Sequence, residues 1–94
     1  MKLVYTDDAI EDLKRLREFI ASHAPSAASR IASELTEKIS LLPDFPLMGT
    51  PVEMAPSPDS IRDMVFNKYL VRYSVHPNAV IILRVWHQLE GERS

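Results

Sequence analysis

The sequence predicts an α+β domain in which an antiparallel helical hairpin packs on one face of a small, mainly antiparallel sheet. Two patterns carry this prediction: apolar residues recur every three or four positions in the first half of the chain and alternate along its last third. The first pattern is typical of amphipathic helices and the second of strands. The 94 residues are expected to form a single domain in the order β-α-α-β-β-β, with the hairpin at about 7–42 and the C-terminal sheet at about 60–87.

The first helix follows a short strand expected over Lys2–Thr6. Thr6 can cap this helix, because its hydroxyl accepts a hydrogen bond from a backbone N–H of the first turn, and the helix should end near Ser22. Its apolar stripe comprises Ala9, Ile10, Leu13, Leu16, Phe19 and Ile20. The opposite face is charged and comprises Glu11, Asp12, Lys14, Arg15 and Glu18.

The second helix has the most regular period in the chain. Pro25 suits its first turn, where a missing N–H is no loss, and Pro43 stops it. The apolar positions are Ala28, Ile31, Ala32, Leu35, Ile39 and Leu42. The short connection between the helices forces them to lie antiparallel. After them we expect an ordered connector over 43–51 and a mobile loop over 53–59.

Three strands should follow, over 60–66, 68–76 and 79–87, the last two joined by a tight turn at Pro77-Asn78. Strand parity divides the side chains of the last two strands between two faces. The face expected beneath the helices is uncharged and carries Tyr69, Val71, Ile81 and Leu83. The face expected to stay open carries Leu70, Arg72, Ser74, Ile82, Arg84 and Trp86, with Arg62 as a further candidate.

Arginine among the apolar residues of a strand costs desolvation free energy unless its face meets water or a partner. Tryptophan, aliphatic residues and arginine together are typical of the centre of a protein interface. The partner contacts predicted on this basis are Leu70, Arg72, Ile82, Arg84 and Trp86. The alternative is a half-solvated face on which the arginine stems cover apolar neighbours.

Composition narrows the functional classes. The chain has 46% hydrophobic and 26% charged residues, as ordinary globular domains do, and no apolar run that could span a membrane. Acidic residues arrive by position 7, which argues against a signal peptide, and cysteine is absent, so we expect a cytoplasmic protein. The net charge of −2 argues against binding to nucleic acid by bulk electrostatics. There is no phosphate loop, serine elbow or pair of histidines at metal spacing, and we expect neither a metal nor a cofactor.

Several short segments occur in an order and spacing shared with one family. They are Ala9–Leu13, Phe19–Ala21, Pro25–Ala28, Leu42–Gly49, Ile61–Asp63, Tyr69–Tyr73 and Ile82–His87. On these segments the chain resembles the ParE/RelE superfamily of toxins from bacterial type II toxin–antitoxin systems, and the ParE branch more than the RelE branch. The resemblance implies a helical hairpin on a small antiparallel sheet. It also implies a cognate, ParD-like antitoxin that wraps the toxin with a C-terminal segment.

The resemblance implies two alternative targets. ParE-like members inhibit DNA gyrase and are not nucleases, whereas RelE-like members cut mRNA on the ribosome with several basic residues and a C-terminal tyrosine or histidine. In this chain such a role would fall to Arg62, Arg84 and His87. That set is incomplete, because Lys68 is the only lysine after Lys38 and the C-terminal tail has no tyrosine.

We therefore expect a DNA gyrase inhibitor with no catalytic residues and no sequence-specific contact with nucleic acid. The first alternative is a ribosome-dependent mRNA endoribonuclease, in which His87 transfers a proton while Arg62 and Arg84 stabilise the developing charge. The second alternative is a non-toxic module that only binds a protein partner.

Overall fold

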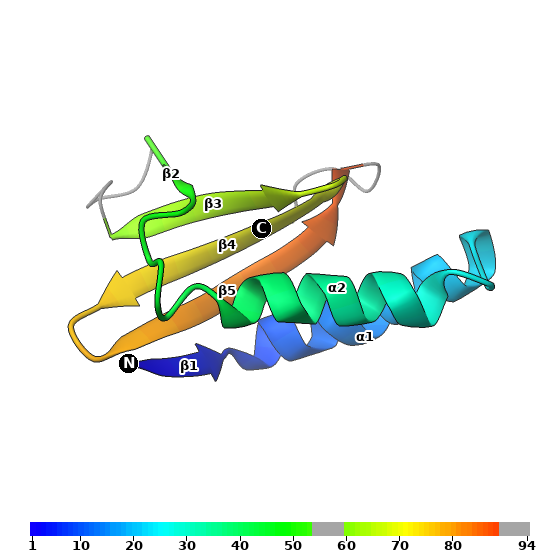
Figure 1. Ribbon diagram of the computed structural model, residues 1–94, viewed down its shortest axis with the longest axis horizontal. Coiled ribbons are helices and arrows are strands. Elements are labelled where there is room, and N and C mark those ends of the chain that lie inside the picture. The colour runs from blue at the N-terminus through cyan, green and yellow to red at the C-terminus, as the bar shows by residue number, and fades with distance from the viewer. Residues whose placement is uncertain (54–59, 89–94) are drawn as a thin grey trace.

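The computed structural model describes residues 1–53 and 60–88 of the chain. Within these ranges the chain forms two helices and a five-stranded sheet in the order β1-β5-β4-β3-β2 (Figure 1). The elements are β1 (Lys2–Tyr5), α1 (Asp7–His23), α2 (Ala28–Ser40), β2 (Thr50–Pro51), β3 (Ile61–Phe66), β4 (Tyr69–His76) and β5 (Ala79–His87). β1 runs parallel to β5, and the other neighbouring strands are antiparallel. The predicted α+β class is confirmed, and β2 is a short strand that the sequence pattern did not indicate.

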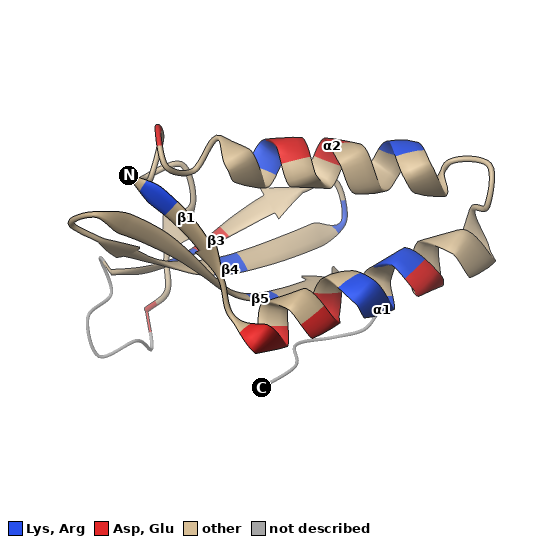
Figure 2. Cartoon of the chain, turned by 90° about the horizontal axis from the view of Figure 1, so that it is seen from below, with Lys and Arg blue, Asp and Glu red and all other residues tan. Residues whose placement is uncertain are grey.

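The two helices form the predicted antiparallel hairpin (Figure 2). Thr6 caps α1 as expected, because the Ala9 N–H donates to Thr6 Oγ1 at 3.0 Å. Asp7 and Asp8 lie in the first turn, where the helix dipole favours negative charge. Ile10 is 40% exposed, so the buried stripe of α1 is narrower than predicted. In Figure 2, α2 lies on one side of the sheet and α1 runs beside β5.

The core lies between the helices and the sheet. Most of its side chains come from α1, α2 and the three long strands, and the buried members are Ala9, Leu16, Ile20, Leu35, Ile39, Leu42, Met64, Tyr69, Val71, Tyr73, Val80, Ile82 and Val85. Removing such side chains from water stabilises the fold by about 1.5–3 kcal/mol for each large aliphatic or aromatic group. The core therefore fixes the position of β4 and β5 beneath the helices.

A β-bulge in β5 changes which of its residues face the core. The pairing of β4 with β5 shifts by one residue between Arg72 and Tyr73, so that Leu83 is an extra residue in β5. An extra residue reverses the parity of a strand on one side of the bulge. Ile82 is therefore buried in the core, and the prediction that it lies on the open face is wrong. The same reversal removes Ile81 from its predicted place beneath the helices.

The connector between α2 and β3 is held against the sheet by Tyr73. Its hydroxyl donates to Pro46 O at 2.7 Å and accepts from the Gly49 N–H at 2.8 Å. A Cβ at Gly49 would lie 2.7 Å from Asp63 O, so this close approach requires glycine. Most of the loop that was predicted to be mobile, residues 54–59, lies outside the described residues.

Two further observations concern the described part of the chain. Neither of its helices is both long and apolar enough to cross a membrane. Within residues 1–53 and 60–88, no three His, Asp or Glu side chains gather in a way that could hold a metal ion. The surfaces that remain to be considered are the side of the sheet away from α2 and the connector.

Candidate protein-contact face of the sheet

The side of the sheet that faces away from α2, here called the far face, carries the charged side chains of the strands. Strand pairing places Asp63, Arg72 and Arg84 beside one another on this face, one from each of β3, β4 and β5. Leu70 and Trp86 pair with each other on the same face. The far face therefore brings together all of the predicted contact residues except Ile82, which the bulge directs into the core.

Arg72 is bound by a carboxylate of the neighbouring strand. Its Nε donates to Asp63 Oδ1 at 2.9 Å, and its Nη2 donates to Asp63 Oδ2 at 3.0 Å. The guanidinium also lies over the Trp86 ring, 5.3 Å from the ring centroid, which is a cation–π geometry. Trp86 is only 4% exposed, so the prediction of an open tryptophan on this face is wrong. The Arg72 guanidinium covers part of this apolar ring.

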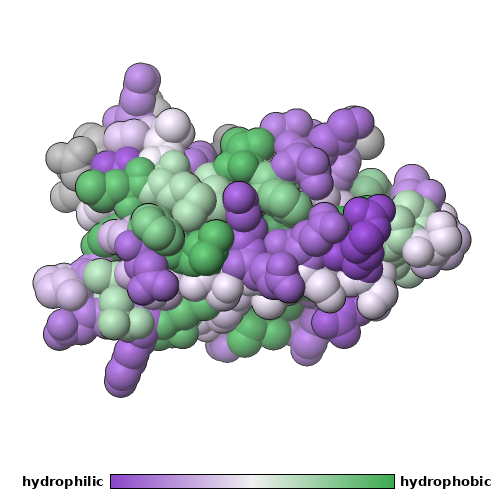
Figure 3. Space-filling model, in the orientation of Figure 1, coloured by the Kyte–Doolittle hydropathy of each residue, from purple (hydrophilic) through white to green (hydrophobic). Residues whose placement is uncertain are grey.

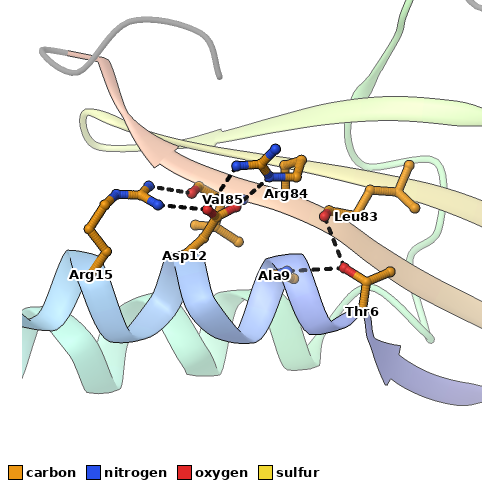
Figure 4. Close-up of polar contacts among 7 residues, drawn as sticks. All are labelled: Thr6, Ala9, Asp12, Arg15, Leu83, Arg84 and Val85. Carbon is orange, nitrogen blue, oxygen red and sulfur yellow. Dashed lines mark hydrogen bonds and ion pairs between the residues drawn. The ribbon is translucent and has the colours of Figure 1, made fainter. Parts of the chain in front are cut away.

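Arg84 is held in the same way by a carboxylate from α1 (Figure 4). Its Nε donates to Asp12 Oδ2 at 2.8 Å, and its Nη2 donates to Asp12 Oδ1 at 3.0 Å. Asp12 also accepts from the Val85 N–H at 2.9 Å and from Arg15 Nη1 at 2.7 Å. The Asp12 side chain is only 3% exposed. Helical periodicity placed it on the charged face of α1, but that side of the helix packs against β5.

α1 reaches β5 because β1 is the shorter strand. β1 pairs only with Ala79–Ile82, which leaves the edge of β5 from Leu83 onward without a neighbouring strand. Buried backbone groups along such an edge need partners. Thr6 Oγ1 donates to Leu83 O at 3.0 Å, and Arg15 Nη2 donates to Val85 O at 3.2 Å (Figure 4). Side chains of the cap and first turns of α1 therefore continue the sheet edge where the strand stops.

Asp63, Arg72, Arg84 and Asp12 form a line across the far face, called the arginine row below. Burial raises the pKa of the Asp12 carboxyl, but the hydrogen bonds from Arg84 and Arg15 outweigh it and hold that pKa below its ordinary value. The hydrogen bond to Asp12 raises the pKa of Arg84 further. The row itself thus pairs two arginines with two aspartates, and Arg15, which also binds Asp12, adds a third arginine beside it.

Arg62 does not join the far face. It pairs with Tyr73 on the core side of the sheet, and its Nη1 donates to Gly49 O at 2.7 Å. Its Nε is buried and meets no hydrogen-bond partner among the described residues. The contacts of Arg62 therefore secure the connector, and the prediction that it belongs to the open face is wrong. The reason is strand parity in β3, which turns Arg62 toward the core.

His87 lies on the core side of the sheet at the end of β5, and only 7% of it is exposed. Its ring contacts Tyr69 edge-on at 4.9 Å and Phe19 at 5.2 Å between centroids. Arg62 and His87 pair with residues of β4 four positions apart, which is about 13 Å along a strand. Arg84 points to the opposite face. The structure thus does not bring together Arg62, Arg84 and His87, the residues that an RNA-cleaving site would use.

A second surface, which the sequence analysis did not predict, lies on the connector after α2. Phe45 is 59% exposed and Leu47 is 66% exposed. Apolar side chains gather over this connector, left of centre in Figure 3. The residues that line it, called the apolar patch below, are Leu41, Phe45, Pro46, Leu47 and Met48. Large apolar side chains in a segment with neither a helical nor a strand period were the signal for this surface.

A helical hairpin packed on a small mixed sheet is the architecture of the ParE/RelE superfamily of toxins. The chain belongs to the ParE toxin family of the type II parDE toxin–antitoxin system, whose model matches residues 3–91. Toxins of this family pair with an antitoxin in a toxin–antitoxin module. The resemblance described in the sequence analysis is therefore confirmed for the superfamily and for the family.

Two curated relatives and two solved structures resemble the chain over most of its length. Toxin RelE2 of Caulobacter vibrioides is 31% identical over 87 residues, 92% of this chain and 93% of the relative. Toxin RelE3 of the same organism is 29% identical over 86 residues, 87% of this chain and 88% of the relative.

Among solved structures, the chromosomal ParDE system of P. aeruginosa superposes with a TM-score of 0.77 at 21% identity, covering 93% of this chain and 95% of the other. YafQ of E. coli superposes with a TM-score of 0.58 at 18% identity, covering 95% and 94%. At these identities the two structures support the fold alone.

Proposed function

We propose that this toxin of a type II module inhibits DNA gyrase and that a ParD-like antitoxin neutralises it, with both proteins in the cytoplasm. The match to a parDE family model supports the gyrase branch of the superfamily. The observation that carries the proposal is the placement of the basic residues. Arg62, Arg84 and His87 occupy three separate environments, which favours contact with a partner over an assembled RNA-cleaving site.

Cleavage of RNA through its 2′-hydroxyl needs a proton acceptor and a cation close to the same phosphate. His87 lies between the rings of Tyr69 and Phe19 on the core side. Arg84 is on the far face and is engaged by Asp12 through two hydrogen bonds. Their placement on opposite faces of the sheet argues against joint action of this imidazole and this guanidinium on one phosphate.

The far face is the proposed contact surface for gyrase. It offers Leu70, the rigid guanidinium groups of Arg72 and Arg84, and the exposed Val65, which pairs with Leu70. Arginines fixed by neighbouring carboxylates lose little conformational entropy when a partner binds, and arginine is frequent among the residues that dominate interface energies. Trp86 supports this surface from beneath Arg72, and Ile82 supports it from the core.

The apolar patch is the proposed anchor for the antitoxin. Phe45 and Leu47 remain largely exposed, although burying a large apolar side chain is worth about 1.5–3 kcal/mol. An amphipathic antitoxin segment would bury both side chains in a hydrophobic groove. Neutralisation would follow if the rest of the segment wrapped the sheet and covered the far face.

Purified gyrase and relaxed plasmid provide the test. We expect the wild-type toxin to stop supercoiling or to trap cleaved DNA, and cognate antitoxin to reverse the effect. Val65→Asp places a charge on the far face at a side chain that is 55% exposed, and it should abolish inhibition without unfolding the protein. Ile10→Asp adds the same charge at an exposed position on α1 and should keep inhibition.

Unchanged supercoiling at micromolar wild-type toxin would rule out the gyrase proposal. The names of the two C. vibrioides relatives, RelE2 and RelE3, are a reason to test the ribonuclease alternative as well. Cleavage of ribosome-bound message that disappears in His87→Ala would establish that alternative. Normal growth on induction without antitoxin would instead identify a non-toxic binding module.

A further inference from the structure

The arginine row has a consequence for the class of macromolecule that the far face can bind. Arg72 and Arg84 pair directly across β4 and β5, and like charges in that position repel one another. Each guanidinium is drawn to its own carboxylate, Asp63 on one side and Asp12 on the other. The row therefore presents rigid arginines without a net positive charge.

We infer that Asp63 and Asp12 act as specificity-determining residues, which keep the far face from binding phosphodiester backbones and reserve it for a protein surface. This inference deepens the proposed function and rests on it. It concerns the class of target, whereas the proposed function concerns gyrase itself.

The hydrogen-bond geometry supports this inference. Each carboxylate accepts from both Nε and Nη2 of its arginine, at 2.8–3.0 Å. This fork is one of the two edges through which a guanidinium can bind a phosphate by two parallel hydrogen bonds. To use this edge, a phosphate would have to displace a carboxylate that is largely buried, because the Asp63 side chain is 19% exposed and that of Asp12 is 3% exposed.

The distribution of charge on the far face is a second, independent argument for this inference. Binding to nucleic acid gains its free energy largely from uncompensated cations that release counterions from the phosphate backbone. The two arginines of the row face two aspartates, so Arg15, which shares Asp12 with Arg84, is the cation that this cluster leaves in excess, and the whole chain carries a net charge of −2. Binding to a protein surface does not require uncompensated cations, because packing and shape complementarity determine much of the affinity between two proteins.

Asp63 is the residue at which specificity can be changed without loss of the fold. Asp12 also accepts from the Val85 N–H and from Arg15, so its replacement disturbs the edge of β5. Within residues 1–53 and 60–88, the Asp63 carboxylate accepts hydrogen bonds from Arg72 alone, and both side chains reach solvent. Asp63→Asn removes one negative charge from the row and leaves the Arg72 fork with a single acceptor.

The test measures binding of a labelled single-stranded RNA and of a duplex DNA of matching sequence, by fluorescence anisotropy at several salt concentrations. We expect Asp63→Asn to bind both probes roughly tenfold more tightly than wild type at low salt, with the gain lost as salt rises. Glu37→Gln makes the same change in net charge on α2 and should bind like wild type. Adding Arg72→Gln to Asp63→Asn should remove the gain. Asp63→Ser replaces Asp63→Asn if the latter fails a thermal-unfolding check.

Equal nucleic-acid affinity of wild type, Glu37→Gln and both folded Asp63 variants would overturn the inference. An equal gain in Glu37→Gln would overturn it too, because net charge and not the row would then be responsible. Neither result bears on whether wild-type toxin inhibits gyrase. The proposal of gyrase inhibition and the inference about Asp63 and Asp12 can therefore fail independently. Conversely, a gain confined to the Asp63 variants supports masking of the arginines even if wild-type toxin leaves supercoiling unchanged.

Discussion

Asp12 joins α1 to β5 through charged and neutral donors at once. Its carboxylate accepts from Arg84 and Arg15 and from the Val85 N–H (Figure 4). A buried carboxylate without such donors would cost several kcal/mol of desolvation free energy. With them, Asp12 closes the edge of the sheet beyond β1 and orients Arg84 on the far face. One residue thus connects the stability of the fold with the geometry of the arginine row.

Asp12→Asn tests this role. Asparagine keeps the size but loses the charge, so Arg84 and Arg15 lose their buried anion. Removing one partner of a buried ion pair typically costs about 3–5 kcal/mol, and the free energy of unfolding at pH 7 should fall by about that amount. Urea denaturation measures it. Glu11→Gln, at an exposed neighbouring carboxylate, should change the free energy by less than about 0.5 kcal/mol.

The sign of the pH dependence follows from the lowered pKa of Asp12. A carboxyl with a lower pKa in the folded state stabilises the fold fully above its unfolded pKa of about 3.9. That stabilisation is lost as the pH falls through the folded value. The difference in the free energy of unfolding between wild type and Asp12→Asn should therefore be largest at neutral pH and should decrease below about pH 4. If this difference stayed constant from pH 7 to pH 3, the charge of Asp12 would not be the source of its contribution to stability.

The helices and strands that could be predicted from the sequence are those that pack against the core alone. α2 and β4 each turn one apolar side to the core, so spacing located them, although α2 begins at Ala28 and the prediction that Pro25 lies in its first turn is wrong. β5 was assigned in part to the wrong face because the extra residue of the bulge, Leu83, is as apolar as its neighbours and interrupts no pattern. Asp12 was assigned to the charged side of α1 because periodicity does not reveal that a helix contacts a strand edge as well as a core.

The connector between α2 and β3 depends on one hydroxyl. Tyr73→Phe removes the donor to Pro46 O and the acceptor of the Gly49 N–H, and it leaves buried polar groups unpaired. Such losses cost about 1–3 kcal/mol, which we expect in the free energy of unfolding from denaturant titration. Tyr5→Phe is the matched control, because the Tyr5 hydroxyl makes no hydrogen bond to the described part of the chain, and it should cost less. Similar losses in the two variants would mean that the hydroxyl of Tyr73 does not hold the connector.

At the scale of the whole molecule, the toxin presents two different surfaces on opposite sides of the sheet. The apolar patch lies on the side of α2 and is visible in Figure 3, whereas the arginine row lies on the far face. The first surface suits burial of apolar side chains, and the second offers rigid hydrogen-bond donors with balanced charge. An antitoxin that wraps the toxin can use the first as an anchor and cover the second.

Leu47→Asp tests the anchor. Leu47 is 66% exposed, so the substitution should leave the melting temperature of the free toxin unchanged. It places a charge where the antitoxin is proposed to bury apolar surface, and the dissociation constant of the complex should rise by at least about tenfold, equivalent to about 1.4 kcal/mol. Isothermal titration calorimetry with the cognate antitoxin measures the change. Ile10→Asp adds the same charge to another exposed apolar side chain, on α1, and should bind as wild type does. Equal weakening by both substitutions would place the anchor elsewhere, because net charge alone would then account for the loss.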